Sequence, residues 1–418
     1  MYFALFLLLI FYDFLEIYIP FFNYWDELAA FAVFCWGGYS FWQNPRMSKG
    51  ELSNWLFLIL LVVIGGLGNL FHPGLQTYPI ACIKDVVALC KMPVIFFLLQ
   101  RRSVSQEKQE EVIAGIARIS RWILAATLLA VVFGRFIDLG FYTGEVRILP
   151  TFQFVFSHPT FFISSYVMIA AALIAESPDK NRLFLLLDCF LIFMAQRSKG
   201  YIFLVFLLLI ILLGEKRCAK ILKSIFGSDT EKMKIGRLLL AVAVLVLAVL
   251  IVGESRIRST LNHGFPVPRT VLHVVGLKIL IDFFPLGSGL GTFASHLSGR
   301  HYSNIYELYE ISNVIGMTRE EYNFISDVFW PYIYGQFGIF GLLVYVKLFI
   351  NIFFRQYRAQ IANASRIAMV AVWIYSMIAS TSEAYFTNGT GVQMALFLGI
   401  FIGFRRQTAS VEKDAVAD

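Results

Sequence analysis

The sequence predicts an all-α polytopic membrane protein with about twelve transmembrane helices and one long loop outside the membrane that contains amphipathic helices. Two observations support this fold class. Of the 418 residues, 58% are hydrophobic and 15% are charged, with a mean hydropathy of +0.70, and a soluble domain cannot bury that much apolar surface. In addition, many apolar residues form runs of roughly 20, the length of helix needed to cross a bilayer.

Nine apolar runs form the first predicted domain, residues 1–253. They lie at about 1–19, 27–43, 53–72, 80–100, 112–134, 159–176, 183–195, 201–214 and 237–253. Pro20 ends the first run, because proline cannot continue a helix. The seventh and eighth runs are short, and the polar residues 196–200 (QRSKG) separate them.

Residues 254–327 form the second predicted domain, the only long segment whose composition does not suit lipid. This segment is polar and rich in Tyr toward its end, and it contains the motif PLGSGLGTF. Three further apolar runs, at about 328–353, 367–383 and 391–404, form the third domain. Residues 405–418 are expected to be a cytoplasmic tail without regular structure.

The distribution of Lys and Arg predicts the orientation in the membrane. If both termini are cytoplasmic, the cytoplasmic loops contain 20 Lys and Arg residues and the outer loops contain 10, while five lie inside the predicted spans. Cytoplasmic loops normally carry this excess. We therefore expect a multi-pass protein with both termini in the cytoplasm, and the net charge of +7 does not indicate a nucleic-acid partner.

Arg197 and Lys199 lie in the break between the two short runs, on the predicted outer side. Two cations at this position run against the positive-inside trend and need water, protein or an anion beside them. An arginine fork with a lysine ammonium is suited to bind a phosphate. An ordinary polar turn between two spans explains the pair equally well.

Arg269 begins a predicted amphipathic helix in the long loop. His273 is four residues further on and shares its face, whereas Lys278 points nearly the opposite way. Arg269, with or without His273, is a candidate to contact an anionic substrate, and the alternative is an interfacial helix facing lipid headgroups. Gly289 lies in a GxGxG pattern without a preceding strand, so we expect a tight turn that brings backbone close to a substrate or another helix.

Asp327 lies where the long loop enters the tenth run. It is a candidate general base, and a helix N-cap or a partner of the helix dipole is the alternative. Lys84, Asp85 and Lys91 lie inside the fourth run, where ionisable residues are candidates for function. Lys84 and Lys91 share a face, and Asp85 is available as an ion-pair partner. The sequence contains no P-loop, HExxH or zinc motif, so we expect no cofactor and no tightly bound metal.

Three features in this order resemble the O-antigen polymerase family (Wzy type), which shares a superfamily with the O-antigen ligases. They are the short helix pair split by QRSKG, Arg269 ahead of PLGSGLGTF, and the run SDVFWPYIYGQFGIFGLL. The resemblance covers roughly residues 184–345. It implies a GT-C-like fold in a bacterial inner membrane, with residues 254–327 as a periplasmic loop.

The resemblance also implies an activity and roles for the candidate residues. A metal-independent, inverting glycosyltransferase would move a growing glycan from undecaprenyl pyrophosphate to a sugar hydroxyl of a lipid-linked repeat unit, and a separate membrane protein would regulate chain length. Arg197 and Arg269 would bind the pyrophosphate, and Asp327, at a position where ligases carry a His, would take the acceptor proton. Further candidate substrate contacts are Lys199, His273, Gly289, Tyr302, Tyr322, Lys84 and Lys91.

Two other activities remain open from the sequence. An O-antigen ligase would transfer finished glycan to a lipid A core. A lipid-linked oligosaccharide flippase would use Lys84, Lys91 and Asp85 in a central cavity and would need no base at the outer face. In the polymerase mechanism, the tyrosines at 302, 306, 309 and 322 are expected to offer stacking faces for sugars.

Overall fold

The computed structural model describes residues 2–227, 267–359, 361–402 and 405–406. These residues are mostly α-helical, with two small two-stranded sheets. The predicted ninth helix at 237–253, residues 254–266 of the long loop, and nearly all of the predicted tail lie outside the described residues. Elsewhere, helices occur close to the predicted positions.

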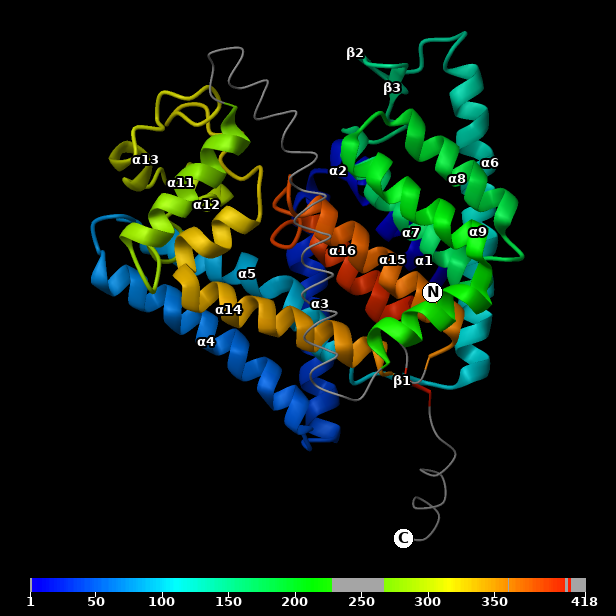
Figure 1. Cartoon of the computed structure of the whole chain (residues 1–418), viewed down its shortest axis with the longest axis horizontal. Helices are drawn as coiled ribbons and strands as arrows, with labels where there is room; N and C mark the ends of the chain where they lie inside the picture. Colours follow the sequence, from blue (N-terminus) through cyan, green and yellow to red (C-terminus); the bar gives the residue numbers. More distant parts are fainter. Residues whose placement is uncertain (1, 228–266, 360, 403–404, 407–418) are drawn as a thin grey trace, which may run out of the picture.

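The first described stretch is mostly helical (Figure 1). These helices are α1 (Tyr2–Ile10), α2 (Tyr12–Tyr18), the short 3₁₀ helix η1 (Pro20–Tyr24), α3 (Trp25–Gln43), α4 (Lys49–Phe71), α5 (Pro79–Leu99), α6 (Gln106–Phe133), α7 (Pro159–Glu176), α8 (Arg182–Met194) and α9 (Ser198–Phe226). The first predicted helix is broken near Phe11, and α9 has a non-helical residue at Gly214.

The second part contains the helices of the long loop and the last apolar helices. These are α11 (Pro268–Asp282), α12 (His296–Arg300), α13 (Ile305–Leu308), α14 (Trp330–Tyr357), α15 (Asn363–Ala379), α16 (Gly389–Phe397) and the π-helix η2 (Leu398–Ile402). The strands are β1 (Ser103–Val104) with β4 (Arg405–Arg406) in parallel, and β2 (Tyr142–Val146) with β3 (Pro150–Phe152) as an antiparallel hairpin.

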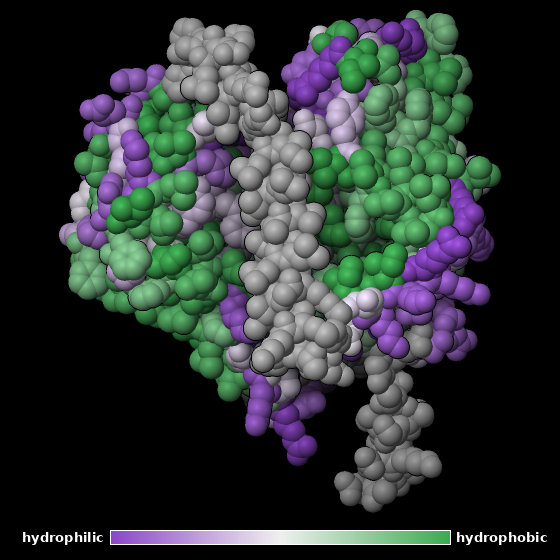
Figure 2. Space-filling model, in the orientation of Figure 1, coloured by the Kyte–Doolittle hydropathy of each residue, from purple (hydrophilic) through white to green (hydrophobic). Residues whose placement is uncertain are grey.

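Four of the described helices are long and apolar enough to cross a membrane. They are α4, α6, α7 and α14, and the shorter apolar helices are Asn363–Ala379 and Gly389–Ile402. Hydrophobic side chains cover much of the helix sides, while hydrophilic ones gather mainly toward the upper and lower edges (Figure 2). A helical protein whose sides are apolar and whose ends are polar fits a bilayer.

Helix α7 forms the centre of one group of helices, with α6, α8 and α15 packed against it. Nearly all of its residues are buried. The small residues Ala170, Ala171 and Ala172 are fully buried, and small side chains allow neighbouring helix backbones to approach closely. This group carries β2 and β3 at the upper end of Figure 1.

Helices α4, α11 and α14 form the second group, seen on the left of Figure 1. Gly338 breaks the regular geometry of α14 with φ +62°, ψ −162°, a conformation that only glycine adopts readily. A Cβ at this position would lie 2.2 Å from the Pro285 carbonyl oxygen. The break thus lets the loop after α11 pass directly against α14.

Candidate functional site

Three ion pairs join the predicted cations to carboxylates from distant parts of the chain. The pairs are Arg197–Glu145, Lys199–Glu383 and Arg269–Asp327. We call these six residues the charged cluster. Their segments are β2, the α8–α9 break, the α15–α16 link and the starts of α11 and α14, which all lie in the upper part of Figure 1.

The α8–α9 break owes its shape to Gln196. This residue has φ +52°, which a non-glycine residue adopts at some cost. Its backbone carbonyl accepts a hydrogen bond from Arg147 Nη1 (3.1 Å), and its side-chain Oε1 accepts one from the Ile148 backbone N–H (3.3 Å). The turn between β2 and β3 therefore holds the break in place, and the next residue, Arg197, is presented toward Glu145.

Arg197 contacts two residues from outside its own helices. Its Nη1 lies 3.3 Å from Glu145 Oε2, and its Nη2 lies 3.3 Å from His158 Nε2. Its Nε–H is buried and has no hydrogen-bond partner within the described ranges. A guanidinium carries five donors, so Arg197 retains capacity to bind another acceptor.

Lys199 lies in the first turn of α9 and pairs with Glu383 of the α15–α16 link. The Lys199 side chain is 8% exposed and that of Glu383 is 15% exposed. Removing one member of such a shielded pair leaves an uncompensated charge, which costs several kcal/mol. The pair therefore ties α9 to the link between the last two helices.

Arg269 and Asp327 form a more open pair. Arg269 Nε and Nη2 each lie 3.0 Å from Asp327 Oδ2, and the two side chains are 33% and 30% exposed. The N-cap alternative for Asp327 is wrong, because α14 begins at Trp330 with Phe329 as its N-cap. An arginine at this distance stabilises the carboxylate and makes it a weaker base while the pair persists.

The charges of the cluster act on one another across the helix groups. The pKa of Arg197 is lowered, first by desolvation and then, against the opposing effect of Glu145, by the positive charges of Arg147 and Arg269. Arg269 and Arg197 therefore lie near enough for their charges to interact, although they are 72 positions apart in the sequence. The structure thus brings the two predicted arginines into one neighbourhood.

His158 belongs to the same neighbourhood. Its pKa is lowered from the usual 6.5 to about 4, by desolvation first and then by the charges of Arg197 and Lys199, with Glu145 opposing and Arg269 adding to the effect. His158 is exposed by its accessible surface, so water screens part of these interactions. Because the pKa is lowered, the His158 ring is neutral at pH 7.

His273 contacts α14 and the α15–α16 link. Its Nδ1 lies 3.1 Å from the Tyr334 hydroxyl, and burial lowers its pKa, with a hydrogen bond to the Thr381 backbone opposing. Lys278, on the other side of α11, is exposed as expected. His273 therefore packs α11 onto α14 and the α15–α16 link.

Gly289 lies in a fully buried loop that packs on a helix. It has φ +100°, and a Cβ there would lie 2.6 Å from the Asn69 backbone nitrogen of α4. Asn69 exchanges two hydrogen bonds with the Leu290 backbone, at 3.0 and 2.8 Å. Of the two expected partners for this turn, another helix is the one found, and the expectation that Gly289 contacts substrate receives no support from this placement.

Most of the tyrosine rings that were expected to stack on sugars pack inside the long loop itself. Tyr302 is buried, and its hydroxyl donates to the Met317 carbonyl (2.7 Å). Tyr306 is fully buried. Tyr322 is half-buried against His296. The expectation that Tyr302 offers a stacking face to sugars is therefore wrong, because that ring fills the loop core. Tyr309, whose hydroxyl donates to Asp282 Oδ2 (2.6 Å), and Tyr322 keep partial exposure.

The three ionisable residues of α5 do not act as one group. Lys91 is buried and pairs with Asp26 and Glu27 of α3, whereas Lys84 is exposed. Asp85 Oδ2 accepts a hydrogen bond from the Gly291 backbone N–H (3.1 Å). Asp85 thus satisfies the buried glycine loop rather than a lysine, and the expected set of Lys84, Asp85 and Lys91 is separated.

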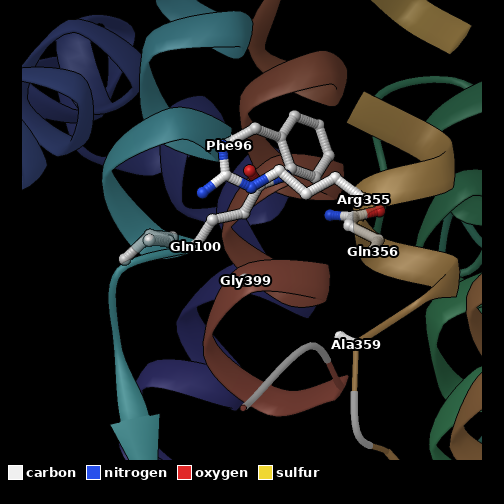
Figure 3. Close-up of a pocket in the computed structure, with 7 residues that line it drawn as sticks. Phe96, Gln100, Arg355, Gln356, Ala359 and Gly399 are labelled. Carbon is white, nitrogen blue, oxygen red and sulfur yellow. The ribbon is translucent and has the colours of Figure 1, made fainter. Parts of the chain in front are cut away.

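A small pocket lies at the opposite end of α14 from the charged cluster (Figures 1 and 3). It is lined by Phe96, Leu99, Gln100, Arg355, Gln356, Ala359 and Gly399. Arg355 reaches across it and bonds Glu51 Oε1 at 2.6 Å. The pair connects the start of α4 to the end of α14, which is a structural task separate from the cluster.

Sequence reasoning missed Glu145, His158 and Glu383. Each lies in a loop or short strand that meets the cluster only through folding. The dipeptide His158-Pro159 directly before an apolar run was a usable signal, because a polar residue followed by proline marks a helix start. Glu383 was also detectable as a single acidic residue in an otherwise apolar C-terminal region.

No protein-family model matches the chain, and no curated protein sequence matches it at a significant level.

Proposed function

We propose that the chain is a metal-independent, inverting glycosyltransferase that polymerises polysaccharide repeat units, in the manner of the O-antigen polymerase family. The charged cluster carries this proposal. Three cations from two segments, the α8–α9 break and the start of α11, lie within range of one another's charge at a partly exposed place, and two of them are arginines. Guanidinium and ammonium groups in this number are the means by which proteins hold a diphosphate.

We further propose that the protein crosses a bacterial inner membrane about twelve times, with both termini cytoplasmic and residues 254–327 in the periplasm. The charge bias supports this orientation. The last turns of α9 carry Lys216, Arg217, Lys220 and Lys223, at the end of that helix away from the cluster. A cytoplasmic location suits these residues, and it puts the cluster on the periplasmic side.

The proposed reaction is one displacement. A hydroxyl oxygen of the lipid-linked acceptor attacks the anomeric carbon of the donor glycan, and the bond from that carbon to the diphosphate oxygen breaks. The electron pair leaves with undecaprenyl pyrophosphate, whose charge Arg197, Arg269 and Lys199 stabilise. Asp327 takes the hydroxyl proton, and diphosphate bound to Arg269 loosens the ion pair and so raises the basicity of Asp327.

A reconstituted assay tests the proposal. The purified protein in nanodiscs receives an undecaprenyl-pyrophosphate-linked repeat unit, and we expect a ladder of longer glycans by gel and mass spectrometry. Arg197→Ala and Asp327→Asn should each lower the rate at least about a hundredfold, since a single transition-state donor and a general base are each worth that much. Lys278→Ala, an exposed change on α11, is the matched control and should leave the rate unchanged.

Normal ladders from well-folded Arg197→Ala and Asp327→Asn would refute the mechanism. Two other outcomes would identify the alternative activities. Glycan transfer only when a lipid A core is the acceptor would indicate a ligase, and movement of the lipid-linked sugar across the bilayer without new glycosidic bonds would indicate a flippase. Addition of a chain-length regulator should change ladder length without being required for bond formation.

A further inference from the structure

His158 occupies the N-cap of the buried central helix α7. Its backbone is extended (φ −151°, ψ 145°), Pro159 follows at the first helical position, and the ring Nδ1 accepts a hydrogen bond from the Thr160 backbone N–H at 3.2 Å. Proline has no N–H, so Thr160 is the first free donor of the helix. The ring nitrogen satisfies it in the way that cap side chains do.

This cap decides which ring nitrogen carries the proton. A neutral imidazole has one donor and one acceptor nitrogen. Because Nδ1 accepts from Thr160, the proton resides on Nε2. Desolvation first, and then the charges of Arg197 and Lys199, lower the pKa of the ring and so favour this neutral form. The Nε2–H is therefore a donor with a fixed direction.

That donor meets a second donor. Nε2 lies 3.3 Å from Arg197 Nη2, and two N–H groups this close cannot bond each other. An oxygen of an anion can accept from both at once. The buried Nε–H of Arg197, without a partner among the described residues, adds further donor capacity. The charges of Lys199 and Arg269 reach the His158 ring as well, although each of these cations is also paired with a carboxylate.

Asp13 holds this arrangement from α2. Its two carboxylate oxygens accept from the Ser157 backbone N–H and hydroxyl, each at 2.7 Å. Ser157 directly precedes His158, so the entry to α7 is fixed on one side by Asp13 and on the other by the Thr160 cap. A ring held at both neighbours loses little freedom when it binds a ligand.

We propose that His158 is a substrate-contacting residue whose Nε2–H donates to a phosphate oxygen of the lipid diphosphate, beside Arg197. This inference rests on the proposed function and deepens it, because it assigns a neutral donor to the diphosphate site. The same donors suit a free inorganic pyrophosphate, so both sources need to be compared.

Two substitutions separate the roles of the two ring nitrogens. The amide oxygen of asparagine reaches the position of Nδ1 and is a good helix cap, so His158→Asn keeps the cap and loses the distal donor. The amide of glutamine reaches the position of Nε2, so His158→Gln keeps the donor and loses the cap. Binding is measured in nanodiscs for undecaprenyl pyrophosphate, undecaprenyl monophosphate and inorganic pyrophosphate, and thermal unfolding is followed in parallel.

We expect His158→Asn to unfold at the wild-type temperature and to bind undecaprenyl pyrophosphate about tenfold more weakly, the typical loss for a hydrogen bond to a charged group. His158→Gln should retain affinity and unfold at a lower temperature. A stronger response to undecaprenyl pyrophosphate than to inorganic pyrophosphate would identify the lipid as the source.

The opposite pattern would overturn the inference. If His158→Asn binds like wild type and only His158→Gln is impaired, His158 is a helix cap alone. If the wild-type protein still forms a glycan ladder in that case, the polymerase proposal remains supported. If His158→Asn binds more weakly but the wild-type protein forms no glycan ladder, the diphosphate contact is supported and the polymerase activity is refuted.

Discussion

At the scale of single residues, the charged cluster is nearly neutral as a unit before any ligand binds. Arg197, Lys199 and Arg269 each have a carboxylate partner, so the proposed diphosphate would have to compete with protein carboxylates. The three partners differ in exposure. Glu145 is 56% exposed, whereas Glu383 is 15% exposed, and an exposed partner is the easier one to displace.

Glu145→Gln tests this competition. The substitution removes the carboxylate beside Arg197 while keeping its shape, so we expect undecaprenyl pyrophosphate to bind about two- to fivefold more tightly, in line with an exposed ion pair worth less than about 1 kcal/mol. Binding titrations in nanodiscs measure the change, and Glu307→Gln, which pairs with Arg319 elsewhere on the long loop, is the control. Weaker binding would mean that Glu145 positions Arg197 instead of competing for it.

The sequence predicted the cations of the cluster but not their partners. Arg197 and Lys199 stood out because polar residues interrupt two apolar runs. Their partners could not be found in the same way, since Glu145 and Glu383 meet them only after helices from different parts of the chain pack together. Asp327 was identified as a candidate, yet its contact with Arg269 depends on where α14 begins, and helix boundaries are the least certain part of a sequence prediction.

At the scale of elements, helix positions were predicted well because apolar runs and prolines mark them. The predicted run at 159–176 coincides with α7. The buried glycine loop was harder to place, because its hydrogen-bond partners are single polar residues inside apolar helices. Asn69, Asp85 and Gln336 satisfy backbone groups of residues 289–291, and buried backbone polar groups require such partners.

Gly289→Ala tests how tightly this loop is fitted to α4. The new Cβ would meet the Asn69 backbone at 2.6 Å, in a conformation with φ +100° that alanine tolerates poorly. We expect a loss of about 2 kcal/mol or more, seen as a lower unfolding temperature of the purified protein. Gly66→Ala, on the same helix α4 with no atom within 4 Å of its added Cβ, is the control.

An unchanged unfolding temperature for Gly289→Ala would show that the loop can move away from α4. The position of the loop would then be adjustable, and the start of α14 and its neighbour Asp327 would not be held by it. A matching fall for Gly66→Ala would point to a general sensitivity of α4 to added volume.

At the scale of the whole molecule, the two helix groups contribute different members of the cluster. Arg197, beside which His158 lies, belongs to the group around α7, and Arg269 with Asp327 belongs to the group of α4, α11 and α14. The α15–α16 link reaches both through Glu383 and Ser380, whose hydroxyl accepts from Trp330 Nε1 at 3.1 Å. A diphosphate bound here would contact both helix groups. The side of the membrane from which it arrives depends on the orientation of the protein.

Cysteine accessibility tests that orientation. In a variant with the five native cysteines replaced by alanine or serine, Thr143→Cys on β2 and Lys216→Cys on the last turns of α9 are each exposed to a membrane-impermeant maleimide in intact cells with a permeabilised outer membrane. We expect Thr143→Cys to react and Lys216→Cys to react only after the inner membrane is broken, because the Lys- and Arg-rich helix ends belong in the cytoplasm. The reverse pattern would place the charged cluster in the cytoplasm, where a periplasmic polymerase could not use it. Reaction of both in intact cells would mean that the inner membrane is not a barrier between the two ends of the molecule, and the twelve-span topology would then be wrong.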